Sequence, residues 1–152
     1  HGLMDLTVSA EGDIQTGWHH TVEDVGITLG QAIRQAIGNG EGIRRVGSAM
    51  VPLDETLAQV VIDVGGRAYS VIEVGLSQDL VGDLPGDLVR HFLEALASEG
   101  RLTLHAQLLY GVNPHHKAEA VFKALGRALR LAVELDPRMG KTIPSTKGTI
   151  SR

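Results

Sequence analysis

The sequence predicts an α+β fold with two similar halves from an internal duplication, each an antiparallel sheet with helices packed on one face. The main observation is that the chain aligns with itself, without a gap, at an offset of 96 positions from His19 to His115. In each copy, a run that alternates between apolar and polar residues precedes a histidine doublet, and apolar residues at helical spacing follow it. We expect one compact domain, with residues 1–84 as the first half-repeat plus central strands and residues 85–152 as the second half-repeat plus a C-terminal tail.

The first half is predicted to contain a strand before His19, a helix after it and then three further strands. A cluster of glycines from position 38 onward ends the helix. The three strands, at 43–54, 57–64 and 68–74, are separated by turn residues and are expected to form a meander. The apolar residues at helical spacing are Val22, Val25, Leu29, Ile33 and Ile37.

The second half is predicted to contain a helix at 87–97, a strand at 102–108 and a helix that carries the second doublet. The strand alternates leucine or alanine with polar residues at period two. Pro114 stands just before the last helix and Pro137 after it, which are the positions where proline bounds a helix. The apolar residues of that helix are Ala118, Val121, Phe122, Leu125, Leu129 and Val133.

Composition excludes several classes of protein. The chain has no cysteine, so disulfides and thiolate metal sites are excluded, and its seven histidines are the main supply of metal ligands. A net charge of -4 with only 3% aromatic residues argues against nucleic-acid binding. No apolar run approaches the roughly 20 residues of a membrane span, and no signal-peptide pattern opens the chain. We therefore expect a cytoplasmic protein, or a plastid one if the source is a plant, without nucleic-acid or membrane partners.

The repeated motif His-His-x-x-Glu predicts a metal site. On a helix, residues three and four apart share a face, so Glu23 lies near both members of His19-His20, which point about 100° apart. One doublet can therefore serve two metal ions, and the same holds for His115-His116 with Glu119. Imidazole and carboxylate ligands suit Mn, Fe or Zn, and the spacing does not choose among them.

Ordinary structural roles compete with this interpretation. A single histidine pair at a helix start more often caps, packs or faces water, but two identical motifs in register favour metal binding. His91 stands beside the apolar Phe92 and Leu93, and His105 lies on the polar side of its strand. By themselves these two histidines are predicted to be structural.

Basic residues form a second candidate site, for binding phosphate. Guanidinium forks, a lysine ammonium and a serine hydroxyl are the groups that bind a phosphate monoester. Each of them is individually more often a solvated surface residue, so this grouping alone is weak. The candidates are Arg44-Arg45, Arg67, Lys123, Ser145 and Lys147.

From end to end, the order and spacing of these motifs resemble the imidazoleglycerol-phosphate dehydratase family. The most specific parts are the two doublet motifs and the Pro-Ser-Thr-Lys-Gly tail. The resembling segments are His19 to Asp24, Gly42 to Arg45, Pro52 to Glu55, Asn113 to Ala124 and Pro144 to Gly148.

The resemblance implies a lyase of histidine biosynthesis that dehydrates imidazole glycerol phosphate to imidazole acetol phosphate. It implies two Mn2+ ions per active site and a homo-oligomer of 24 subunits with active sites between subunits. The implied metal ligands are His19, His20, Glu23, His91, His115, His116 and Glu119. The implied contacts to the phosphate substrate are His1, Arg45, Arg67, Lys123, Ser145 and Lys147.

The resemblance also implies a mechanism. With both ring nitrogens bound to metal, the substrate imidazole is stabilised as imidazolate and expels the neighbouring hydroxyl, giving a diazafulvene-like intermediate. That electron sink makes the next C–H bond labile, and the carboxylate of Glu119 or Glu23 is the predicted catalytic group for proton transfer, with an acidic residue that family members carry upstream as a competitor. Asp54 is predicted to orient a ligand.

One departure concerns the start of the chain. Family members carry, before the residue that matches His1, a helix that supplies a further metal ligand, and an acidic residue still further upstream. We therefore expect the start of the first half-repeat to be missing, with His1 near the substrate. His91-Phe92-Leu93 resembles the missing segment, as the second-half copy of a duplicated motif should.

Two alternatives come from other classes of protein. A dinuclear metal phosphoester hydrolase would use similar ligands with a metal-bound water as nucleophile. A non-catalytic metal-binding shell protein would bind ions through the doublets without a substrate pocket. Release of inorganic phosphate would favour the first alternative, and absence of affinity for the substrate would favour the second.

Overall fold

The computed structural model describes residues 1–150 of the chain, so the last two residues of the predicted 85–152 half lie outside it. Three long helices, six strands and one short 3-10 turn make up the described part. In chain order they are the 3-10 turn Ile14–Thr16, α1 His19–Ile37, β1 Val46–Leu53, β2 Thr56–Asp63, β3 Tyr69–Glu73, β4 Leu80–Val81, β5 Leu84–Pro85, α2 Asp87–Gly100, β6 Thr103–Tyr110 and α3 Pro114–Val133.

Four of the strands form one mixed sheet with the order β1-β2-β6-β3. β1 pairs with β2 and β2 with β6 in antiparallel fashion, whereas β3 runs parallel to β6. The predicted meander is therefore wrong, because β6 lies between β2 and β3. Parallel neighbours require a crossover connection, and α2 supplies it in a β3-α2-β6 unit.

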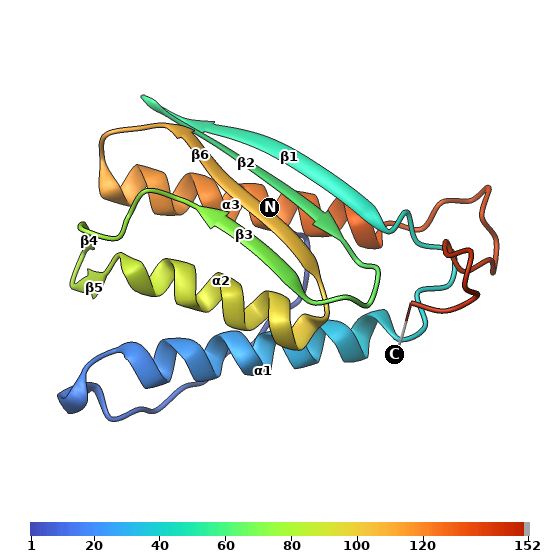
Figure 1. Ribbon diagram of the computed structural model, residues 1–152, viewed down its shortest axis with the longest axis horizontal. Helices are drawn as coiled ribbons and strands as arrows, with labels where there is room; N and C mark the ends of the chain where they lie inside the picture. The colour runs from blue at the N-terminus through green and yellow to red at the C-terminus, as the bar shows by residue number, and fades with distance from the viewer. Residues whose placement is uncertain (151–152) are drawn as a thin grey trace.

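The three helices lie together and begin at the same end of the molecule (Figure 1). α3 packs on β1 and β2, α2 packs on β3, and α1 packs mainly on α2. Parallel helices place their first turns side by side, so the two doublets and the start of α2 share one end of the fold. Among residues 1–150, no helix combines the length and apolar character needed to cross a membrane.

The core lies between the sheet and the helices. Alternate residues of the two central strands point into it and are at most 1% exposed, among them Val60 and Ile62 of β2 and Leu104 of β6. α3 contributes Val121 and α2 contributes Leu93 to the same cluster. The predicted α+β class and the packing of helices on one face are confirmed.

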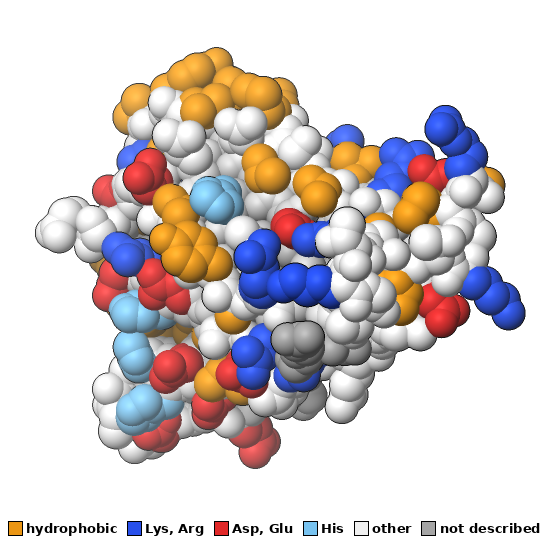
Figure 2. Space-filling view, turned by 45° about the vertical axis from the view of Figure 1, so that its right-hand side comes forward, with side chains coloured by type: hydrophobic (Ala, Val, Ile, Leu, Met, Phe, Trp, Pro, Cys, Tyr) orange, Lys and Arg blue, Asp and Glu red, His pale blue; other side chains and the backbone are white. Residues whose placement is uncertain are grey.

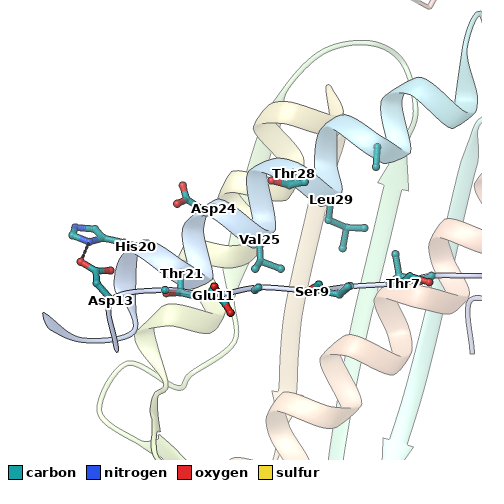
Figure 3. A pocket seen from close by; sticks show the side chains of 15 residues that line it. Thr7, Ser9, Glu11, Asp13, His20, Thr21, Asp24, Val25, Thr28 and Leu29 are labelled. Carbon is teal, nitrogen blue, oxygen red and sulfur yellow. Dashed lines mark hydrogen bonds and ion pairs between the residues drawn. The ribbon is translucent and has the colours of Figure 1, made fainter. Parts of the chain in front are cut away.

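The segment before α1 differs from the predicted strand. Residues 1–13 belong to no helix or strand, and apolar side chains such as Leu6 and Val8 are more than half exposed. Extended chain becomes a strand only by pairing with a neighbouring strand, and in the described residues this segment runs along α1 instead (Figure 3). The strands thus form one sheet and a small β4-β5 hairpin, and the duplication itself stays a prediction.

Candidate functional site

The two histidine doublets occupy the first turns of α1 and α3. α1 begins at His19, and α3 begins at Pro114. Asn113 caps α3, because its side-chain oxygen accepts hydrogen bonds from the backbone N–H groups of His115 at 2.9 Å and His116 at 3.3 Å. Proline suits the first helical position, where no N–H is needed. The cap and the proline together fix where α3 starts and where its doublet lies.

The first histidine of each doublet faces the glutamate four residues later. Nε2 of His19 lies 3.8 Å from a carboxylate oxygen of Glu23, and Nε2 of His115 lies 3.0 Å from Glu119. These spacings follow from helical geometry, which places residues i and i+4 on one face. Both pairs combine one imidazole nitrogen with one carboxylate.

The second histidine of each doublet faces a carboxylate from outside its own helix. Nδ1 of His20 lies 3.4 Å from Asp13, the interaction drawn in Figure 3, and Nδ1 of His116 lies 2.7 Å from Glu55. In both pairs Nδ1 is the nitrogen that meets the carboxylate. The two copies of the motif therefore make matching contacts, although Asp13 and Glu55 do not correspond in the sequence repeat.

His91 joins the first doublet from a neighbouring helix. It lies at the beginning of the second turn of α2, and its ring centroid is 4.9 Å from that of His19 in an edge-to-face arrangement. Nδ1 of His91 is 3.9 Å from Glu94 on the same helix. The structure thus brings His91, predicted only through the family resemblance, next to the first doublet.

The predicted ligands meet in small groups within one chain. Among residues 1–150, no three histidine or carboxylate side chains are arranged so that they could hold a metal ion together. The donors are the nitrogen and oxygen groups that Mn, Fe or Zn accept. The described part of one chain therefore does not assemble the predicted ligands into a single metal site. Figure 2 shows histidine side chains among acidic ones at one edge of the molecule.

Glu119 has a second partner on α3. Nζ of Lys123 lies 2.6 Å from one oxygen of Glu119, while His115 meets the other. The Lys123 ammonium, and to a smaller extent His115, hold the pKa of Glu119 below its ordinary value. Glu119 therefore stays ionised at neutral pH and can accept a proton or a metal ion.

Glu55 is the most strongly perturbed carboxylate of the site. Its Oε1 accepts hydrogen bonds from the backbone N–H groups of Asn113 at 2.8 Å and Val112 at 3.1 Å. The backbone N–H of Asn113, followed by the ring of His116, holds the pKa of Glu55 far below its usual range. The same carboxylate raises the pKa of His116. An ionised Glu55 is thus part of the site at neutral pH.

A basic cavity of about 250 Å³ lies between the β1 and β2 ends and the C-terminal tail, and Arg45 is tied into its wall. Nε and one Nη of Arg45 donate to the two carboxylate oxygens of Asp63, at 2.7 and 2.9 Å, and its other Nη donates to the carbonyl oxygen of Pro144 at 2.8 Å. Such a fork fixes the guanidinium and the start of the tail together. The residues lining the cavity are Arg45, Gly65, Gly66, Arg67, Ser145, Thr146, Lys147, Thr149 and Ile150.

Two predicted phosphate contacts lie elsewhere. Lys123 belongs to the row of His115 and Glu119 on α3, and His1 lies beside Gly126, further along the same helix. The structure therefore brings four of the six predicted contacts into the basic cavity and the other two onto α3. The roles of all six stay predictions.

The basic cavity and the doublets lie at opposite ends of α3. The backbone N–H of Arg45 donates to the carbonyl oxygen of Ala132, in the last turn of that helix. From His115 to Ala132 the helix rises by about 25 Å, at roughly 1.5 Å per residue. The two groups of candidate residues in one chain are therefore well separated.

Three carboxylates of these sites were absent from the sequence prediction. Asp13, Glu55 and Asp63 reach their partners through tertiary contacts that no local spacing reports. The prediction named Asp54 as the residue that orients a ligand; its side chain is 76% exposed and lies 3.8 Å from His116. The sequence did show two adjacent acidic residues, Asp54 and Glu55, in the turn between β1 and β2. It did not show which of the two contacts a histidine.

The fold and the site define a class of α+β proteins that present repeated His-His-x-x-Glu motifs at the first turns of parallel helices. The family model described as imidazoleglycerol-phosphate dehydratase matches residues 1–129. The chain belongs to the imidazoleglycerol-phosphate dehydratase family.

Individual relatives agree with this assignment. The imidazoleglycerol-phosphate dehydratase of Bordetella avium is 55% identical over 150 residues, covering 99% of this chain and 77% of that protein. The one from Chloroflexus aggregans is 54% identical, covering 99% and 73%. The crystal structure of imidazoleglycerol-phosphate dehydratase from Staphylococcus aureus superposes with a TM-score of 0.77 at 40% identity, covering 84% of this chain and 72% of that one.

Proposed function

We propose that the chain is the catalytic part of an imidazoleglycerol-phosphate dehydratase, a lyase that converts imidazole glycerol phosphate to imidazole acetol phosphate in histidine biosynthesis. The observation that carries the proposal is the matched geometry of the two doublets, each at a helix start and each paired with carboxylates. Family membership supports it independently. A basic cavity supplies the groups that a phosphate monoester requires.

The doublets suit Mn2+, and we propose two ions per active site. The donors would be His19, His20, Glu23, His91, His115, His116 and Glu119, a set of nitrogen and oxygen ligands without sulfur. The ions would favour the deprotonated form of the substrate's imidazole ring. Glu23 and Glu119 each lie beside an imidazole, so the chain holds two pairs of these donors together.

The side chains of the site have distinct roles in this proposal. Glu119, ionised and held by Lys123, is placed to accept the proton removed from the glycerol chain, with Glu23 as the equivalent group of the other copy. Arg67, Ser145 and Lys147 would bind the phosphate, while Arg45, tied to Asp63, holds the cavity wall and the tail in place.

The distance between the two groups of residues supports an active site that is shared by two chains. The substrate spans roughly 10 Å from ring to phosphate by ordinary bond lengths. The doublet and the basic cavity of one chain are about 25 Å apart along α3. We therefore propose that the cavity of one subunit meets the doublets and Lys123 of another, as in the 24-subunit homo-oligomer that the family resemblance implies.

The first experiment measures metal content and particle mass on one manganese-treated sample, by elemental analysis and light scattering. About two ions per chain in a particle of roughly 24 subunits would support the dinuclear dehydratase. Small particles with fewer ions per chain would contradict the proposed assembly and site.

A product assay separates the proposal from its alternatives. Incubation with imidazole glycerol phosphate is expected to yield imidazole acetol phosphate with no release of inorganic phosphate. Phosphate release would show the hydrolase instead. Metal binding without turnover and without affinity for the substrate would show the non-catalytic shell protein.

A further inference from the structure

We propose that Glu55 is a positioning residue that fixes the ring orientation and tautomer of His116, so that Nε2 is the ring nitrogen left free to bind a metal ion. The inference rests on the proposed function only for the identity of that ligand. The orientation of the ring follows from contacts within the chain.

Glu55 divides its two oxygens between two tasks. Oε1 accepts hydrogen bonds from the backbone N–H groups of Val112 and Asn113, at 3.1 and 2.8 Å, and from the hydroxyl of Thr56 at 3.1 Å. Oε2 faces Nδ1 of His116 at 2.7 Å. One oxygen thus ties the turn between β1 and β2 to the start of α3, and the other holds the ring.

The tautomer follows from the chemistry of this contact. An ionised carboxylate can only accept hydrogen bonds, so the nitrogen that faces it must carry the proton. In the neutral ring of His116, Nδ1 is then protonated and Nε2 holds the lone pair. Metal-binding histidines commonly donate their second ring N–H to a carboxylate in this way, which fixes the ring and raises its basicity.

Asp54 does not take this role. Its oxygen lies 3.8 Å from Nε2 of His116, beyond hydrogen-bond distance, and its side chain is 76% exposed. The Asp54 carboxylate therefore lies on the solvent side of Nε2, which is the nitrogen proposed to bind the metal ion. Its positive φ of 46° is a conformation that asparagine tolerates, which makes Asp54→Asn a matched neighbouring control.

The other copy has a weaker version of the same contact. Nδ1 of His20 lies 3.4 Å from Asp13, whose pKa is lowered first by the Thr16 hydroxyl at 2.9 Å and then by His20. His116 of the second doublet is therefore held more firmly than His20 of the first. The repeated use of Nδ1 supports a positioning role rather than a chance contact.

Glu55→Gln is the test because it separates the two tasks. The amide oxygen can still accept the hydrogen bonds of Val112 and Asn113, while the amide nitrogen replaces the oxygen that faces His116. A donor at that position favours the opposite tautomer, with the proton on Nε2. The variant should therefore keep the anchored turn and lose the oriented ligand.

The tautomer is read by solid-state 15N spectra of the metal-free chain labelled on histidine, at alkaline pH where the imidazoles are neutral. A His116→Gln sample assigns the His116 signals among the seven histidines. We expect the Nδ1–H form in the unsubstituted chain and in Asp54→Asn, and the Nε2–H form in Glu55→Gln. An unchanged Nδ1–H form in Glu55→Gln overturns the inference.

Binding and stability complete the test. Manganese affinity, measured by titration calorimetry, should fall by about 10–100-fold in Glu55→Gln and by much less in Asp54→Asn, which removes a nearby charge but no hydrogen bond to the ring. Tm should stay close to that of the unsubstituted chain in Glu55→Gln and fall in Glu55→Ala, which also loses the hydrogen bonds to Val112 and Asn113.

Equal manganese affinities of Glu55→Gln and the unsubstituted chain overturn the inference. Absence of manganese binding by the unsubstituted chain contradicts the proposed function instead, and the tautomer spectra still decide the role of Glu55.

Discussion

The polar row on α3 shows how single residues set the chemistry of the site. His115, Glu119 and Lys123 follow one another at four-residue intervals, so they share one helix face. Glu119 lies between two cations or potential cations, which keeps its carboxylate ionised. In this row an ionised carboxylate, which can act as a base, is held in one orientation beside an imidazole. An isolated surface carboxylate is not held in this way.

Replacing Glu119 by glutamine tests this base. The amide keeps the shape of the side chain but can neither accept a proton at neutral pH nor bind a metal ion strongly. Turnover of imidazole glycerol phosphate should fall by at least about 100-fold, the range of a lost general base. Tm should change little, because the partners of Glu119 are exposed or only half-buried. The control is Glu134→Gln, which removes a surface ion pair with Arg44 and should leave turnover unchanged. A near-normal kcat in Glu119→Gln would remove Glu119 from the mechanism.

The pair of Glu55 and His116 predicts a pH window of stability in the metal-free chain. The lowered pKa of Glu55 stabilises the fold above the unfolded carboxyl value of roughly 4.3, and this contribution is lost as the pH falls through the folded pKa. The raised pKa of His116 stabilises the fold below the unfolded value of roughly 6.5 and is lost as the pH rises through the folded pKa. Both contributions are complete between about pH 4.5 and 6.5.

Thermal unfolding checks this window. The difference in Tm between the unsubstituted chain and Glu55→Gln should be largest between about pH 4.5 and 6.5 and should shrink on both sides. The same scan on Glu41→Gln, which removes an exposed carboxylate next to Asn39, controls for the general effect of losing a charge. A difference that is constant from acid to alkaline pH would show that the charges of this pair do not contribute to folding.

The residues of the site divide into those that the sequence could predict and those that it could not. The doublets and their glutamates were predictable because helical spacing alone places residues 19, 20 and 23, or 115, 116 and 119, on neighbouring faces. Glu55 meets His116 across 61 positions, and Asp63 meets Arg45 from the neighbouring strand. Contacts of this kind depend on strand pairing and on how helices dock, neither of which a local pattern contains.

At the scale of elements, two glycines set how closely α1 approaches α2. Gly26 and Gly30 are buried on the face of α1 that meets α2. A Cβ added to Gly30 would lie 2.7 Å from the carbonyl oxygen of Leu96 and 2.8 Å from the backbone nitrogen of Gly100. Both neighbours are backbone atoms that cannot turn aside. The close approach also places His19 beside His91 at the helix starts.

Gly30→Ala should therefore destabilise the chain, although alanine is the better helix former by about 1 kcal/mol. The overlap with the α2 backbone is expected to outweigh that gain and leave a net loss of about 1–2 kcal/mol. Tm should fall by about 2–8 °C in calorimetry. Thr28→Ala, an exposed change on the same helix, should alter stability by no more than about 0.5 kcal/mol. A higher Tm for Gly30→Ala would show that α1 and α2 are not tightly packed.

For the strands, the sequence predicts the positions along the chain but not the order in the sheet. Their positions were predicted closely, for example 57–64 against the observed Thr56–Asp63. Their pairing was not, because the central place of β6 depends on Leu104 and Ala106, which are at most 1% exposed beneath the helices. Period-two alternation reports that one face of a strand is buried, but not which strand lies beside it.

At the scale of the whole molecule, the parallel helices separate two kinds of chemistry. Histidines and carboxylates gather at the helix starts, while Arg45, Arg67 and the tail gather at the other end of α3. Figure 2 likewise shows a cluster of lysine and arginine side chains in the middle of this face, apart from the histidine edge, although other basic side chains adjoin that edge. A separation of about 25 Å is too great for one small substrate to span, which is the reason for proposing that two chains share each site.

Mixed particles test whether two chains share each active site. Glu119→Gln removes the proposed base at the helix starts, and Arg67→Ala removes a cation of the basic cavity, whose guanidinium makes no ion pair within the described residues. Each variant alone should be nearly inactive. If the doublets of one subunit meet the cavity of another, co-expression of both variants in equal amounts leaves about a quarter of the sites with both parts intact, since the two parts are drawn independently. Particles isolated through a different tag on each variant should then show about a quarter of normal turnover. Activity no higher than that of the separate variants would place the whole site in one chain, and α3 would then have to bend or the tail to move for a substrate to reach both ends.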